Sequence, residues 1–90
     1  MTRTKRWSVD IYIDEHDDDT TRAEARLQTP DRTHLKGVGT AHRNPSDVNV
    51  PEIGDELAVA RALTDLGRVL LRTTAEDIED VTHENVRLPR

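Results

Sequence analysis

The stretch from Val50 to about Thr73 constrains the fold most, because no other part of the chain carries a long helical pattern. Pro51 suits the first turn of a helix, where its missing N–H would have no partner. Glu52 and Asp55 complement the positive end of the helix dipole. One apolar stripe recurs at helical spacing, and we expect it to face a sheet: Ile53, Leu57, Ala60, Leu63, Gly67, Leu70 and Leu71. A second stripe is more than one sheet face needs, and we expect it to contact a partner subunit: Val59, Ala62, Leu66 and Val69.

Three alternating runs precede this helix, and period-two alternation is typical of strands with one buried face. The first spans 5–14, the second 21–27 and the third 34–43. The second contains Ala-Glu-Ala-Arg, which favours helix by propensity, but the run is short and follows a turn signal. The inward side chains are predicted to be Trp7, Val9, Ile11 and Ile13, then Thr21, Ala23, Ala25 and Leu27, then Leu35, Gly37, Gly39 and Ala41. The pattern therefore predicts an α+β fold, a three-stranded antiparallel sheet with one long helix packed on one face.

Glycines and turn residues refine this expectation. Gly37 and Gly39 lie on the predicted inner face, where glycines usually indicate a close neighbour, and we expect Gly67 of the helix to contact them. Asn44-Pro45-Ser46-Asp47 has the residue preferences of a type I turn. Thr74-Ala75-Glu76-Asp77 resembles a capping box. It predicts that the first helix ends near Thr73 and that a short C-terminal helix covers 75–81.

The composition predicts one small domain that needs help to stay folded. Only 33% of the 90 residues are hydrophobic, and Phe is missing. A chain of this size builds a thin core, so we expect self-association. Residues 1–90 are read as a single domain, with 1–4 and 83–90 as tails that are flexible or contact a partner. The net charge of −5 gives no global attraction for nucleic acid. Neither a signal peptide nor a membrane span is predicted, so the cytoplasm is the expected compartment.

The sequence offers little for catalysis or for metal binding. Ser8 and Ser46 stand in no nucleophile elbow, and the fragment 37–39 lacks the rest of a dinucleotide motif. The acidic turn 14–19 lacks the spacing of a calcium loop and is read as a solvated hairpin. Cysteine is absent. We therefore expect a non-enzymatic protein without catalytic residues, cofactor, metal site or small-molecule substrate.

The outward face of the predicted sheet is the more informative feature. Several basic side chains and one tyrosine share it, and a basic sheet face is a recognised route to RNA. The candidate RNA-contact residues are Arg6, Tyr12, Arg22, Arg26, Lys36 and His42, with Arg43 nearby. Three alternatives stay open: an ordinary mixed surface, a face covered in a dimer, or a face that binds a protein partner.

Almost the whole chain also resembles a known family. The residues that carry the resemblance are Trp7-Ser8-Val9-Asp10-Ile11-Tyr12-Ile13-Asp14-Glu15-His16, Ala23-Glu24-Ala25-Arg26-Leu27, Leu35-Lys36-Gly37-Val38-Gly39, Asn44-Pro45-Ser46-Asp47, the stretch 50–63, Asp77-Ile78-Glu79 and Val81-Thr82-His83. They resemble small actinobacterial dsRBD-like domains of unknown function, whose mycobacterial members are associated with dormancy and hypoxia. The resemblance implies a β-β-β-α fold, a homodimer and a stress or dormancy role similar to that of ribosome hibernation promoting factors, with ribosomal RNA as the partner. A protein-binding adaptor or regulator that uses the open sheet face is the alternative.

Overall fold

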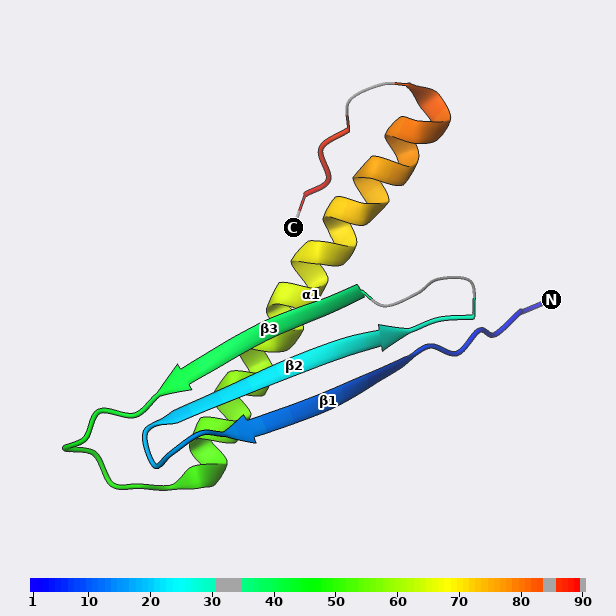
Figure 1. Cartoon of the computed structure of the whole chain (residues 1–90). Helices are drawn as coiled ribbons and strands as arrows, with labels where there is room; N and C mark the ends of the chain where they lie inside the picture. The colour runs from blue at the N-terminus through cyan, green and yellow to red at the C-terminus, as the bar shows by residue number, and fades with distance from the viewer. Residues whose placement is uncertain (31–34, 84–85, 90) are drawn as a thin grey trace.

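The computed structural model describes residues 1–30, 35–83 and 86–89 (Figure 1). Three strands, β1 (Ser8–Glu15), β2 (Thr20–Gln28) and β3 (Leu35–His42), precede one long helix, α1 (Pro51–Thr82). The strands form an antiparallel sheet in the order β1-β2-β3. This confirms the predicted α+β architecture. His34, which begins the third predicted strand, and residues 84, 85 and 90 of the predicted tail lie outside the described residues.

Short polar turns set the register of the sheet. In the β1–β2 turn, a carboxylate oxygen of Asp17 accepts hydrogen bonds from the backbone N–H groups of Asp19 and Thr20 at 2.7 and 2.9 Å. Ile11 then lies opposite Ala25, and Ala25 opposite Gly37, so these residues share one face. After β3, the Asn44 carbonyl accepts from the Asp47 N–H at 2.8 Å, which confirms the predicted turn.

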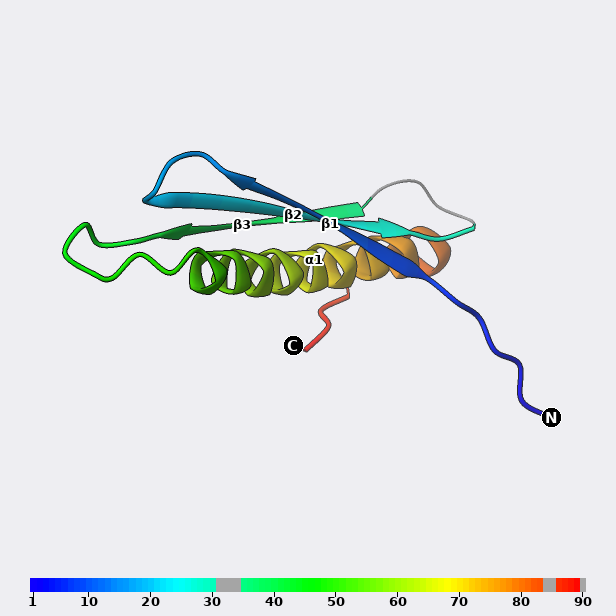
Figure 2. The ribbon, with the colours of Figure 1, turned by 90° about the horizontal axis from the view of Figure 1, so that it is seen from below.

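The core lies between α1 and the inner face of β2 and β3, and it is built from small residues. Figure 2 shows α1 running along one side of the sheet. A Cβ atom on Gly37 would overlap the backbone of Ala62 and Leu66, and one on Gly39 would overlap the backbone of Ala58 and Ala62. The expected role of the strand glycines is thus confirmed. The buried hydrophobic residues are Ala23, Ala25, Leu27, Ala41, Ala58, Ala62 and Leu66.

The predicted orientation of the helix is wrong over most of its length, although Leu70 of the expected stripe does pack against the core. Ile53, Leu57 and Leu63 were expected in the core, yet they are exposed, and Ala60 and Gly67 are exposed as well. Nothing lies within 4 Å of a Cβ built on Gly67, so its expected contact with the strand glycines is absent. Because α1 lies so close to β3, only the side of the helix that carries the small residues Ala58 and Ala62 fits against the sheet.

Because α1 faces the sheet with a different side than predicted, the predicted subunit contact changes as well. Ala62 and Leu66 are buried against the sheet and are not available to a partner. Val59 is half-buried and packs against the same core, and Val69 is half-buried.

The short C-terminal helix is also a wrong prediction, because α1 continues without a break to Thr82. The Thr74 hydroxyl donates to the carbonyl of Leu70 at 2.8 Å, one turn back in the same helix. It therefore does not cap a new helix start. The helix ends at His83, which adopts a left-handed conformation (φ 60°), and whose N–H donates to Glu79. Within the described residues, no helix is both long and apolar enough to cross a membrane.

Candidate functional site

The inner face of β1 carries a strip of large apolar side chains that the described residues cover only in part. Trp7 is 54% exposed, and Val9, Ile11 and Ile13 are 41%, 38% and 42% exposed. The reason is geometric, because a helix about 10 Å wide covers roughly two strands spaced about 4.8 Å apart. The helix α1 lies over β3 and β2 and barely reaches β1. We call Trp7, Val9, Ile11 and Ile13 the β1 strip.

The flank of α1 nearest to β1 extends this apolar surface. Arg61 and Asp65 of α1 contact β3, so they mark the flank that faces away from β1. Leu63 lies about 200° around the helix from each of them, which places it on the β1 side. Its side chain is 45% exposed. The sequence pattern did not predict this surface, although one signal was present: Ile11 and Ile13 of β1 have only the alanines Ala25 and Ala23 opposite them on the same face.

The two edges of the sheet differ. On β3, the Asp65 carboxylate accepts from the Val38 N–H at 2.9 Å, and the Arg61 guanidinium donates to the Thr40 carbonyl at 2.7 Å. Side chains of α1 thus occupy backbone groups of that edge. On β1, no described side chain bonds to the backbone of the outer edge. An open edge with an apolar face favours pairing with another strand.

The outer face is organised around Glu24, which is only 7% exposed. Arg26 donates to its carboxylate at 2.6 Å, and the Arg22 and Lys36 nitrogens lie 3.6 Å from the other carboxylate oxygen. The hydrogen bond from Arg26 holds the pKa of Glu24 below its ordinary value, with attraction from all three cations adding to it. The same bond raises the pKa of Arg26, whose guanidinium lies 4.2 Å from the centre of the Tyr12 ring.

The predicted RNA-contact residues are therefore only partly gathered. Tyr12, Arg22, Arg26 and Lys36 share the outer face, and His42 joins them opposite Thr20 at the end of β3. Arg6 precedes β1 and is exposed. The register also places acidic side chains on this face, since Asp10 pairs with Arg26 and Asp14 with Arg22. Three cations (Arg22, Arg26, Lys36) meet three carboxylates (Asp10, Asp14, Glu24), so the face within the sheet is balanced in charge.

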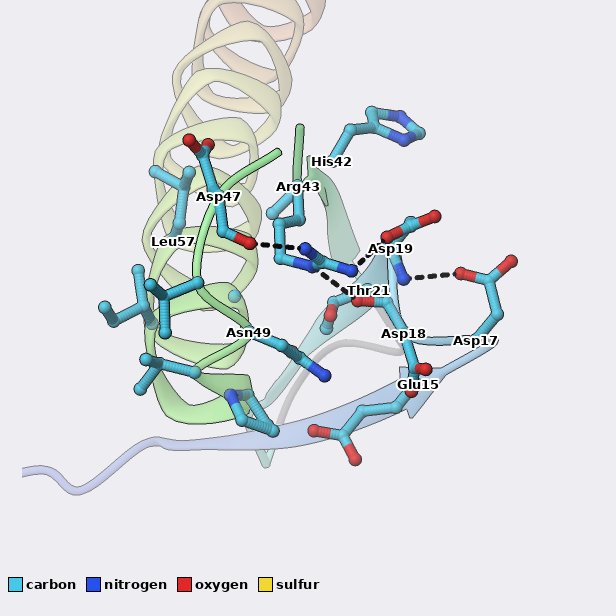
Figure 3. Close-up of a pocket in the computed structure, with 16 residues that line it drawn as sticks. Glu15, Asp17, Asp18, Asp19, Thr21, His42, Arg43, Asp47, Asn49 and Leu57 are labelled. Atoms are coloured by element: carbon cyan, nitrogen blue, oxygen red, sulfur yellow. Dashed lines mark hydrogen bonds and ion pairs between the residues drawn. The ribbon is translucent and has the colours of Figure 1, made fainter. Parts of the chain in front are cut away.

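Arg43 does not belong to that face. Figure 3 shows it turned into a pocket between the β1–β2 turn, residues 43–50 and the start of α1. The volume of this pocket is about 560 Å³. Its guanidinium donates to the Asp19 carboxylate at 2.6 Å and to the Asp47 carbonyl at 2.7 Å. Val50, Ile53 and Leu57 form the apolar wall of the pocket. Arg43 thus links residues 43–50 to the β1–β2 turn, and its charge is already paired with the Asp19 carboxylate.

Two carboxyl groups meet where β1 approaches α1. A hydrogen bond with Asp55 is the main cause that raises the pKa of Glu15, and repulsion by the charges of Asp55 and Glu52 adds to it. One Asp55 carboxylate oxygen is buried without a hydrogen-bond partner in the described structure. Repulsion within this pair lowers the stability of the fold when both groups are ionised. The pair does not place a nucleophile beside a base.

Comparison with known proteins gives consistent results. The Rv2632c-like family profile matches residues 5–87. The uncharacterized protein MT1780 of Mycobacterium tuberculosis (strain CDC 1551 / Oshkosh) is 57% identical over 84 residues, which cover 93% of this chain and 87% of the relative. The uncharacterized protein Rv2632c of Mycobacterium tuberculosis (strain ATCC 25618 / H37Rv) is 49% identical over 82 residues, 91% of this chain and 86% of the relative.

A solved structure extends the likeness to the fold. The crystal structure of Rv2632c superimposes with a TM-score of 0.80 at 47% sequence identity, over 92% of this chain and 96% of that chain. The order of strands and helix found here is therefore that of a known fold, and the wide coverage leaves no large part of the chain outside the match. The chain belongs to the Rv2632c-like family.

Proposed function

We propose that the protein is a non-enzymatic binding module that works as a homodimer, with the β1 strip at the subunit contact. The observation that carries this proposal is the exposure of Val9, Ile11 and Ile13 on one face of β1, with exposed Trp7 immediately before the strand. A contiguous apolar patch with polar surroundings is typical of a protein interaction site.

The make-up of the core supports self-association. The buried hydrophobic residues of the described chain are mostly alanines, and no large side chain is fully buried. Completing the burial of a half-exposed aliphatic side chain contributes roughly 1 kcal/mol. Partial burial of the β1 strip against a second copy therefore offers a few kcal/mol, a large share of the stability of a small domain.

Sedimentation at decreasing protein concentration tests this proposal. We expect a dimer that dissociates on dilution, and Ile11→Asp should raise its dissociation constant roughly a hundredfold, because the contact would bury a charge. Val81→Asp is the matched control, since Val81 is an exposed aliphatic residue near the far end of α1. Ile11→Thr serves where the aspartate variant fails to fold. A wild-type protein that stays monomeric at high concentration contradicts the proposal.

Ribosomal RNA is the second candidate partner, and one observation favours it. Arg22, Arg26 and Lys36 stand on neighbouring strands with Tyr12 beside them, and their side chains are partly or largely exposed. An aromatic ring among cations is suited to stacking on a base. The hibernation-factor-like role implied by the family resemblance would use this contact. Glu24, Asp10 and Asp14 offset these cations, so we place a protein partner first.

Co-sedimentation with ribosomes at two salt concentrations distinguishes the two partners. Binding through phosphates falls steeply with salt. The double variant Arg22→Glu, Arg26→Glu should abolish binding, while Arg68→Glu, Arg72→Glu on the exposed side of α1 should not. If no binding occurs at low salt, the RNA contact is excluded and the dimer proposal stands unchanged.

A further inference from the structure

We propose that the two subunits join through β1, edge to edge and antiparallel, so that two three-stranded sheets become one sheet of six strands. This inference rests on the proposed homodimer and specifies its geometry. Three independent features of the described residues support it: the state of the sheet edges, the charges that flank β1, and the sequence of β1 itself.

The first feature is the difference between the two edges. Asp65 and Arg61 occupy the Val38 N–H and the Thr40 carbonyl on β3, so a second chain would have to displace them. The outer edge of β1 meets no such obstacle within residues 1–30, 35–83 and 86–89. Addition of a strand satisfies its free backbone groups and continues the sheet.

The second feature is the charge polarity of β1. Arg3, Lys5 and Arg6 precede the strand, whereas Asp14, Glu15 and the acidic turn 17–19 follow it. In an antiparallel pair of identical strands, the basic flank of each chain lies beside the acidic flank of the other. A parallel pair would place like charges side by side. The flanks are therefore complementary only in the antiparallel arrangement, which is also the arrangement that a two-fold axis produces.

The third feature fixes the register. Paired residues must point to the same face, so the two-fold axis passes beside a residue rather than between two. Centring on Ile11 places Ile11 opposite its own copy, Val9 opposite Ile13, and Asp10 opposite Tyr12. Centring on Asp10 would pair two copies of Asp10, and centring on Tyr12 would pair Asp10 with Asp14. Like charges directly opposite each other are destabilising, and centring on Val9 or Ile13 would shorten the paired stretch of β1. The Ile11-centred register is therefore favoured.

This register places the two β1 strips side by side on the helix side of the sheet, where the cross-strand pairs cover part of each apolar side chain. The outer faces, each with its Glu24 cluster, become continuous on the other side. Pairing of this kind is distinct from a dimer in which the two β1 strips pack flat against each other. In the flat dimer, Asp10 and Tyr12 would point away from the partner, which provides the basis of a test.

Disulfide trapping tests the geometry, and the absence of native cysteine removes any background. We expect an equimolar mixture of Asp10→Cys and Tyr12→Cys proteins to form a cross-linked heterodimer on mild oxidation. Directly opposite residues lie close to disulfide distance, whereas two copies of residue 10 are diagonal neighbours about 7–8 Å apart. The mixture should thus yield roughly tenfold more cross-linked product than Asp10→Cys alone. Asp10→Cys mixed with Thr40→Cys is the control, since Thr40 lies on the same outer face at the other edge.

The outcomes separate this inference from the proposed function. If the protein sediments as a dimer and Ile11→Cys forms a disulfide while the Asp10–Tyr12 mixture does not, the strips pack flat and the edge pairing is wrong, although the homodimer stands. A protein that sediments as a monomer, with no cross-link from either set, overturns both. Cross-linking of the mixture in a dimeric sample supports both.

Discussion

The backbone of Gly39 in β3 lies against the backbone of Ala62 in α1 so closely that a methyl group on residue 39 would overlap it. Neither partner in this contact is a flexible side chain, so the helix itself would have to move. This relationship sets how near α1 lies to the sheet, and thereby which strands it covers and which it leaves open.

Gly39→Ala should therefore destabilise the fold by about 3 kcal/mol or more, at the upper end of the usual cost of overpacking a core. Urea denaturation measures the change. Gly67→Ala provides the contrast, because a Cβ on Gly67 meets nothing within 4 Å and alanine favours the helix by up to about 1 kcal/mol. Equal stability of Gly39→Ala and wild type would show that the close contact is not needed.

Glu24 should make the fold sensitive to acid. Its pKa in the folded protein lies below the ordinary value of 4.5, chiefly because Arg26 donates a hydrogen bond to it. A carboxyl group with a lowered pKa stabilises the fold fully above its ordinary pKa, and loses that contribution as the pH falls through the folded-state pKa. Glu24→Gln should be less stable than wild type at neutral pH, and the difference should vanish in strong acid. Thermal unfolding from pH 7 to pH 2 measures it, with exposed Glu76→Gln as control. A difference that does not change with pH would contradict this role of the Glu24 charge.

Glu15 should act in the opposite sense. Asp55 raises the pKa of Glu15 in the folded protein, so ionisation of both groups costs stability above that pKa. This cost disappears as the pH falls through the raised value towards 4.5. We expect Glu15→Gln to be more stable than wild type at pH 7 and equal to it in acid, by the same unfolding measurement. Glu56 is exposed and directly follows Asp55 in α1, so Glu56→Gln should leave the stability of the fold unchanged. A less stable Glu15→Gln protein at pH 7 would show that the two carboxyl groups do not repel each other.

The strands were predictable in detail because period two assigns each side chain to a face without knowledge of the partner. Ala25 and Gly37 are inside and Glu24 is outside, as their positions in the alternation require. The helix was harder, because it carries both large and small residues that repeat at helical spacing. The periodicity alone did not reveal that Gly37 and Gly39 would select the small side, Ala58 and Ala62, and leave Leu57 exposed.

The candidate site was predicted less well than the fold. Alternation gave the composition of the outer face, but the position of Glu24 among Arg22, Arg26 and Lys36 depends on the strand register. The β1 strip was predicted to be core, because an apolar strand face normally is. Its exposure follows from the width of one helix against three strands, and from the position of that helix over β2 and β3. Neither quantity can be read from a sequence pattern.

Amide hydrogen exchange along β1, measured above and below the dissociation concentration of the dimer, tests the central claim most directly. Edge pairing predicts that the outward amides of residues 8–15 become protected as the concentration rises. The backbone N–H of Val38 already donates a hydrogen bond to the Asp65 carboxylate of the same subunit. It should therefore exchange at the same rate at every protein concentration. Protection of the β1 amides that does not depend on concentration would contradict a contact between subunits through this strand.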